Sequence, residues 1–121
     1  MDEVSIIQYM LGIISQIKLY HWTTMKYGVH KALDDLYEKT NTSVDKFVES
    51  FLGRYKKQPL KKFTINTKAN TEIDTLITWL ETERDTLDKM QKPFAKASEL
   101  QNILQEMVAD FDTAIYLCKL T

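Results

Sequence analysis

Four stretches of this chain repeat their apolar residues at the spacing of an α-helix, and only one connection between them is long. The stretches are residues 3–25, residues 29–52, a third from Asn66 or Thr71 to about Met90, and a fourth that opens at Ser98. Short turns join the first two and the last two, so each pair is expected to form an antiparallel hairpin. The sequence therefore predicts an all-α fold, one four-helix domain over residues 1–121, with the long connection, residues 53–66, crossing between helices two and three.

Residues that favour helix ends lie where these stretches meet. Asp2 is expected to cap the first helix, and Gly28 to lie in the turn that follows it. Gly53 is expected to stop the second helix, and Ser98-x-x-Gln101 has the form of a capping box at the start of the fourth.

The first helix is apolar on more than one side. A second apolar row supplements its main one: Ile7, Leu11, Ile14 and Leu19. We therefore expect several neighbours to cover this helix, including neighbours from another subunit. His21 lies at the edge of the same surface, where a buried structural histidine is the simpler interpretation for that residue alone. Trp22 is expected in the core or in an interface, and Cys118 falls on the buried row of the fourth helix.

The second helix has three faces, whereas a helix that only covers a core needs two. With His30 at zero on a helical wheel, the acids share one side, at about 40° for Asp34, 60° for Asp45, 80° for Glu38 and 100° for Glu49. Acids four residues apart repel each other unless a cation lies between them. Imidazole and carboxylates together suit iron, manganese or zinc. The alternative interpretation is an ordinary solvated acid face with a histidine at its edge.

Composition and missing motifs exclude several classes of function. The net charge of −1 gives no overall attraction to nucleic acid, and a single cysteine cannot form an internal disulfide, which suits a reducing compartment such as the cytoplasm. No span is long enough for a membrane helix, and the acidic N-terminus does not read as a signal peptide. The chain has no Glu-x-x-His, no glycine-rich phosphate loop and no Cys/His zinc spacing, so an ordinary di-iron centre within one chain is disfavoured.

The polar residues of this region resemble those of the Dps group, the miniferritins that oxidise and store iron. The resemblance rests on His21-Trp22, His30-x-x-x-Asp34 and Asp45-x-x-x-Glu49, and the intervals from His30 onward fit without a gap. The interval from His21 to His30 looks a few residues shorter than is usual in that group. The resemblance implies a ferritin-like fold and a ferroxidase centre that binds iron and oxidises Fe(II) with peroxide or oxygen. It implies that the metal ligands and catalytic residues are His21, His30, Asp34, Asp45 and Glu49.

A single chain cannot complete such a centre. His30 and Asp45 are fifteen positions apart, which is roughly 22 Å along a straight helix. A second copy of the helix, antiparallel across a twofold axis, brings the histidine end of one chain to the acid pair of the other and forms two equivalent sites. The resemblance implies the same inter-subunit arrangement in a homo-oligomer, a dimer at least and typically a shell of twelve subunits.

Two departures from the Dps group bear on partners. The lysine-rich tail that often binds DNA in that group is not expected here, because the sequence opens with the first helix and closes with the fourth. The connection holds five basic residues with few aromatics, so DNA binding is expected to be weak or absent. The connection, residues 53–66, also shows little helical periodicity, whereas the Dps group usually has a short helix in its connection. The alternative function is a structural or interaction protein of ferritin-like fold without ferroxidase activity.

Overall fold

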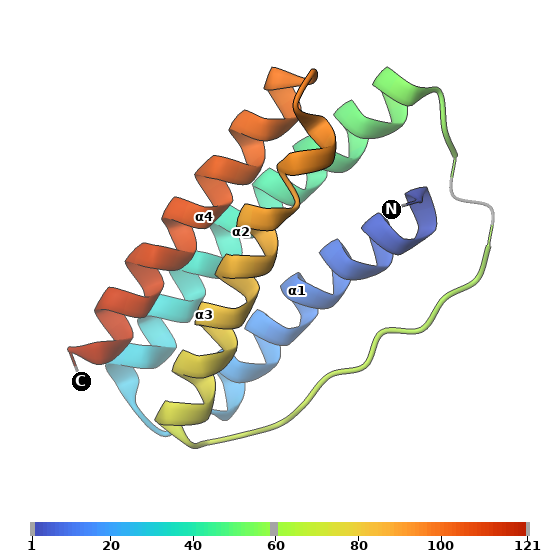
Figure 1. Cartoon of the computed structure of the whole chain (residues 1–121). Helices are drawn as coiled ribbons and strands as arrows, with labels where there is room; N and C mark the ends of the chain where they lie inside the picture. The colour runs from blue at the N-terminus through green and yellow to red at the C-terminus, as the bar shows by residue number, and fades with distance from the viewer. Residues whose placement is uncertain (1, 59–60, 121) are drawn as a thin grey trace.

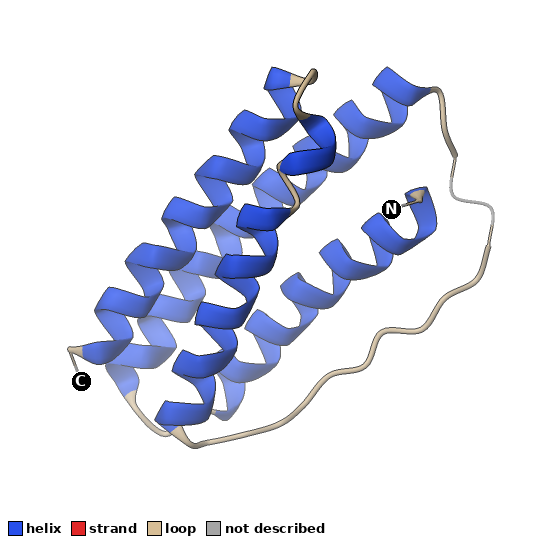
Figure 2. Cartoon of the chain, in the orientation of Figure 1, coloured by secondary structure: helices blue, strands red, loops and turns tan. Residues whose placement is uncertain are grey.

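A computed structural model describes residues 2–58 and 61–120, and within them every regular element is helical (Figure 2). The elements in chain order are α1 (Glu3–Thr23), α2 (Tyr27–Tyr55), α3 (Ile73–Lys89), the short 3-10 helix η1 (Lys92–Phe94) and α4 (Ser98–Lys119). The prediction of an all-α chain with four long helices is confirmed for these residues. None of the helices in the described part combines the length and the hydropathy needed to cross a bilayer.

The helices pack as two hairpins (Figure 1). α1 runs antiparallel to α2 and α3 runs antiparallel to α4, while α2 and α4 pack along each other and join the hairpins. The close helix pairs are therefore α1–α2, α2–α4 and α3–α4, whereas α1 and α3 approach each other less closely. The side chains that fill the centre come from all four helices: Tyr20, Phe47, Phe111, Ile6, Met10, Ile17, Leu33, Leu80, Leu87, Leu100, Leu104 and Met107.

Cys118 lies in this core with none of its surface exposed, as its place on the apolar row of the fourth helix predicts. Burial raises the pKa of its thiol to about 11, because a thiolate is poorly solvated among apolar side chains. The thiol therefore stays protonated at neutral pH.

A segment that we call the strap, residues 61–72, lies along α1 and leads to the start of α3 (Figure 1). Gln8 Nε2 donates to the carbonyl oxygen of Thr64 at 2.7 Å, near the beginning of α1. Gln16 and Lys68 bond each other twice, since the Gln16 amide donates to the Lys68 carbonyl and accepts from the Lys68 backbone N–H. The strap thereby covers the side of the bundle where α1 and α3 stand apart.

The ends of α2 differ from the prediction. The helix begins at Tyr27, so Gly28 lies inside its first turn and not in the turn before it. The residue that precedes the helix is Lys26, whose φ of −112° and ψ of 122° are extended. Gly53 does not stop the helix, which continues to Tyr55. It ends at Lys56, which adopts a left-handed conformation with φ of 53°.

Two caps were also predicted, with opposite outcomes. The cap of α1 is confirmed, because the Asp2 carboxylate accepts a hydrogen bond from the Ser5 N–H at 2.7 Å. The capping box of α4 is wrong: the capping position is Ala97, which has no side-chain acceptor, and Ser98 is already helical. The Gln101 side chain instead donates to the carbonyl oxygen of Gln91 at 3.1 Å, which ties α4 to the turn before it.

Candidate metal centre

The two histidines of the chain face each other across the turn between α1 and α2. His21 lies in the last turn of α1 and His30 in the first turns of α2, and their rings stack with centroids 3.8 Å apart and planes 20° from parallel. His21 is buried and His30 is half-buried. The edge-of-core position expected for His21 is therefore correct, but its ring packs against the other histidine.

Each histidine is held by the backbone of the other. His21 Nδ1 lies 2.8 Å from the carbonyl oxygen of His30, and His30 Nδ1 lies 2.8 Å from the carbonyl oxygen of His21. A carbonyl oxygen can only accept a hydrogen bond, so both Nδ1 atoms carry the proton. In the neutral ring the lone pair is then on Nε2, which is the atom left to bind a metal ion.

Asp34 joins the histidines from the next turn of α2. Its carboxylate oxygen lies 3.9 Å from Nε2 of His21, and its side chain is 37% exposed. The structure thus brings His21, His30 and Asp34 together. Within the part of the chain that is described, however, no group of three or more acidic, histidine or cysteine side chains has the geometry to hold a metal ion.

Asp45 and Glu49 form a separate pair further along α2. Both are exposed, and they lie roughly 22 Å from His30 along the helix axis, at 1.5 Å per residue. A side-chain hydrogen bond with Asp45, and then the negative charge of Asp45, raise the pKa of Glu49 above its ordinary value. The two carboxylates repel each other when both are charged, and a cation between them would relieve that repulsion.

A mostly apolar groove of about 180 Å³ lies next to this acid pair, between α1 and α2. Its lining comes from both helices: Ile7, Leu11, Ile14, Asn41, Val44, Asp45 and Val48. The second apolar row of α1 supplies three of these residues, and Leu11 is 37% exposed. The sequence predicts that a neighbour covers this row of α1. It does not predict that Asn41 and Val48 line the groove, because the apolar face assigned to α2 lies elsewhere on that helix.

The turn beside the histidines exposes large apolar side chains. Trp22 is 66% exposed, so the core position considered for it is wrong and the interface position stays a prediction. Met25 and Tyr27 are exposed still further, and the ring of Tyr27 stacks at 6.2 Å from that of His30. The ammonium of Lys18 lies 5.6 Å above the Trp22 ring, which holds the indole along the outside of α1.

Comparison with known proteins identifies a family, but the description of that family names no activity. A family model described as a family of unknown function matches residues 21–118, a span that begins at His21 and includes all five candidate ligands. No curated protein matches the chain, and no solved structure matches it.

Proposed function

The chain belongs to DUF5856, a family of unknown function, and we propose from its own residues that it is a Dps-like protein that binds Fe(II), oxidises it at inter-subunit sites and stores or detoxifies the product. In this proposal the four helices form a ferritin-like bundle, with the connection between α2 and α3 as its long crossover. The observation that carries the proposal is the reciprocal bonding of the two histidines, which leaves both Nε2 atoms with lone pairs.

That bonding is the support that metal-binding histidines ordinarily have. A ligating imidazole usually donates its other ring N–H to a carbonyl or a carboxylate, which fixes the tautomer and the direction of the ring. Here His21 and His30 each meet the requirement, and Asp34 adds a carboxylate near Nε2 of His21.

The register of α2 supports a site shared between two chains. The midpoint of His30 and Glu49 in the sequence falls between positions 39 and 40, and the midpoint of Asp34 and Asp45 falls at the same place. Two antiparallel α2 helices related by a twofold axis at that point place the histidine cluster of one chain opposite Asp45 and Glu49 of the partner subunit. The mostly apolar groove beside Asp45 lies on the same side of α2 and supplies surface for this contact.

The chemistry follows from the ligand types. The two histidines supply neutral nitrogen atoms, whereas the carboxylates of Asp45 and Glu49 supply negative charge that favours Fe(III) over Fe(II). Asp34 is either a further ligand or a group that orients a water molecule or a histidine. One molecule of hydrogen peroxide takes one electron from each of two Fe(II) ions and, with two protons, leaves as two water molecules. Glu38 lies on the same face and is exposed, so it is not assigned a role.

The setting of this activity is part of the proposal. The protein is a homo-oligomer, at least a dimer, and a twelve-subunit shell is the assembly that the Dps resemblance implies. It works in the cytoplasm, where a lone buried cysteine stays reduced. DNA contributes little as a partner, because the net charge is −1 and only five of the 16 Lys and Arg residues gather in the connection, between positions 54 and 62.

The test combines an iron assay with a measurement of size. Fe(II) is added anaerobically, peroxide follows, and Fe(III) formation and peroxide consumption are recorded for the original chain, for His30→Ala and for the matched control Glu38→Gln. We expect saturable oxidation that His30→Ala removes and Glu38→Gln keeps, in a particle of at least two subunits by light scattering. Equal rates in all three proteins would refute the assignment of the site.

A second candidate function has its own observation in favour. Trp22, Met25 and Tyr27 form an exposed apolar turn, which suits a structural or interaction protein without ferroxidase activity. A folded dimer that neither binds nor oxidises iron would favour this alternative.

A further inference from the structure

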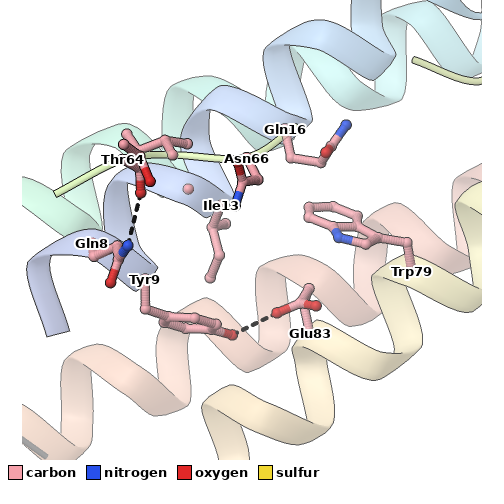
Figure 3. Close-up of a pocket in the computed structure, with 10 residues that line it drawn as sticks. Gln8, Tyr9, Ile13, Gln16, Thr64, Asn66, Trp79 and Glu83 are labelled. Carbon is pink, nitrogen blue, oxygen red and sulfur yellow. Dashed lines mark hydrogen bonds between the residues drawn. The ribbon is translucent and has the colours of Figure 1, made fainter. Parts of the chain in front are cut away.

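A second cavity lies on the side of the bundle where α1 and α3 stand apart (Figure 3). It measures about 310 Å³, which is at the lower end of the range for small-molecule sites. α1, the strap and α3 all contribute to its lining: Gln8, Tyr9, Gly12, Ile13, Gln16, Thr64, Ile65, Asn66, Trp79 and Glu83. None of these residues belongs to the candidate metal centre.

One of the lining residues, Gly12, is a glycine in the middle of α1. Glycine inside a helix costs about 0.5–1 kcal/mol relative to alanine, so the fold gains nothing from it unless space is needed. A Cβ atom on Gly12 would meet only Ile65 Cγ2, at 4.0 Å, which is ordinary van der Waals contact. Neither packing nor backbone conformation therefore requires glycine here, and its effect is to leave the cavity open between α1 and the strap.

One charged group lies in the cavity, and it is an acid. Glu83 accepts a hydrogen bond from the Tyr9 hydroxyl at 2.8 Å, which fixes the direction of its carboxylate (Figure 3). Burial and the neighbouring carboxylate raise the pKa of Tyr9, so its hydroxyl stays neutral and remains a donor. No lysine, arginine or histidine lines the cavity, and among the described residues Glu83 is in none of the ion pairs.

The aromatic part of the lining is the Trp79 side chain, which packs against two other rings. The Trp79 indole reaches from α3 toward α1 and Asn66 (Figure 3). It is held by an edge-to-face contact with Tyr20 at 5.4 Å and a tilted contact with Phe111 at 6.2 Å. An aromatic ring and a carboxylate in one cavity are the groups that attract an organic cation, the first through its π electrons and the second through its charge. The amide groups of Gln8 and Asn66 offer oxygen acceptors for N–H groups.

We infer that this cavity binds a small alkylammonium ion, with the ammonium beside Glu83 and the alkyl part against Trp79 and Ile13. The strap forms the outer wall, so its hydrogen bonds to α1 determine the width of the site. The site is separate from iron chemistry, and its test contains no metal.

The test follows the fluorescence of Trp79. Because the chain has 2 tryptophans, Trp22→Phe makes Trp79 the only one. This protein is titrated with n-butylammonium, 1-butanol and butyrate, which share a chain length and differ in charge, at constant ionic strength maintained with sodium chloride. We expect a saturable change for n-butylammonium and none for 1-butanol or butyrate.

Two variants on the same background locate the site. Glu83→Gln retains an oxygen for Tyr9 and removes the charge, so n-butylammonium should bind about tenfold more weakly, the range for a charged hydrogen bond. Glu81→Gln, two positions earlier on the same helix, is the matched control and should bind as before. Gly12→Leu fills the cavity and should abolish binding, while circular dichroism verifies that each variant is folded.

The inference would be overturned by any of the following results. One is the absence of any saturable response to n-butylammonium in the folded protein. Another is equal binding of 1-butanol or butyrate, which would show a site that does not select positive charge. The third is unchanged affinity in Glu83→Gln, or an equal saturable response to magnesium chloride, which would exclude an organic cation held by this carboxylate.

Discussion

Mixed dimers of two inactive variants test whether the metal centre is shared. His30→Ala is made in one chain and Asp45→Ala in another. The two residues are fifteen positions apart on one uninterrupted helix, which is roughly 22 Å and far beyond the span of one ion's ligands. Each variant alone therefore forms homodimers in which both sites lack a ligand, and each should fail to oxidise Fe(II).

The recovery expected in the mixed dimer follows from the twofold symmetry. One site combines the two altered positions and is doubly broken, whereas the other combines an intact His30 with an intact Asp45. A purified mixed dimer should therefore have about half the sites of the original dimer, and an equal mixture that pairs at random should have about one quarter.

The assay uses two affinity tags, one on each chain, so that two successive columns isolate mixed dimers before Fe(II) oxidation is measured. The control pairs His30→Ala with His21→Ala. Both changes lie at the histidine end, so neither site of that mixed dimer is complete and nothing should be recovered. Zero recovery in verified His30→Ala and Asp45→Ala dimers would refute the shared site, because a site within one chain cannot be restored by a partner.

Three further outcomes are expected. Asp45 raises the pKa of Glu49, so the folded chain holds that proton more tightly than the unfolded chain, and the free energy of unfolding falls as the pH rises through that pKa. Glu49→Gln should remove this fall, giving a gain in urea unfolding at neutral pH that shrinks in acid; a gain independent of pH would contradict the argument. Thr40→Val should stabilise the fold by about 1 kcal/mol, because the buried Thr40 hydroxyl has no hydrogen-bond partner among the described residues; a loss of stability in thermal unfolding would show that this hydroxyl has one. Gly12→Ala should stabilise α1 by about 0.5–1 kcal/mol, since the new methyl group meets only Ile65, and a lowered midpoint in denaturant would indicate a clash.

Helix positions were predictable because apolar spacing reports directly on which face is buried. Helix ends were less predictable, because they depend on competition between local conformations. Gly28 and Gly53 are both compatible with helix, and the neighbouring residues Lys26 and Lys56 are the ones that leave it. At α4 the side chain of Gln101 bonds the preceding turn, a tertiary contact that a local motif does not encode.

The candidate site was predictable in its residues but only partly in its geometry. Helical register alone places Asp34, Asp45 and Glu49 on one face with His30. The mutual carbonyl bonds of the histidines depend on how the turn at residues 24–26 folds back, and spacing does not report that. The position of the strap was missed for a related reason. Its one sequence signal is Gln16, a polar residue between Ile13 and Ile17 on a helix face that is otherwise buried.

The strap also bears on the order in which the protein is completed during translation. Its bonds to α1 join residues 56, 52 and 47 positions apart, so α1 leaves the ribosome well before its polar side chains can find their partners in the strap. Until then the α1–α2 hairpin presents its apolar rows to the surroundings of the nascent chain. The α1–α2 hairpin is therefore exposed to aggregation during synthesis until α4 packs along α2 and covers its apolar side chains.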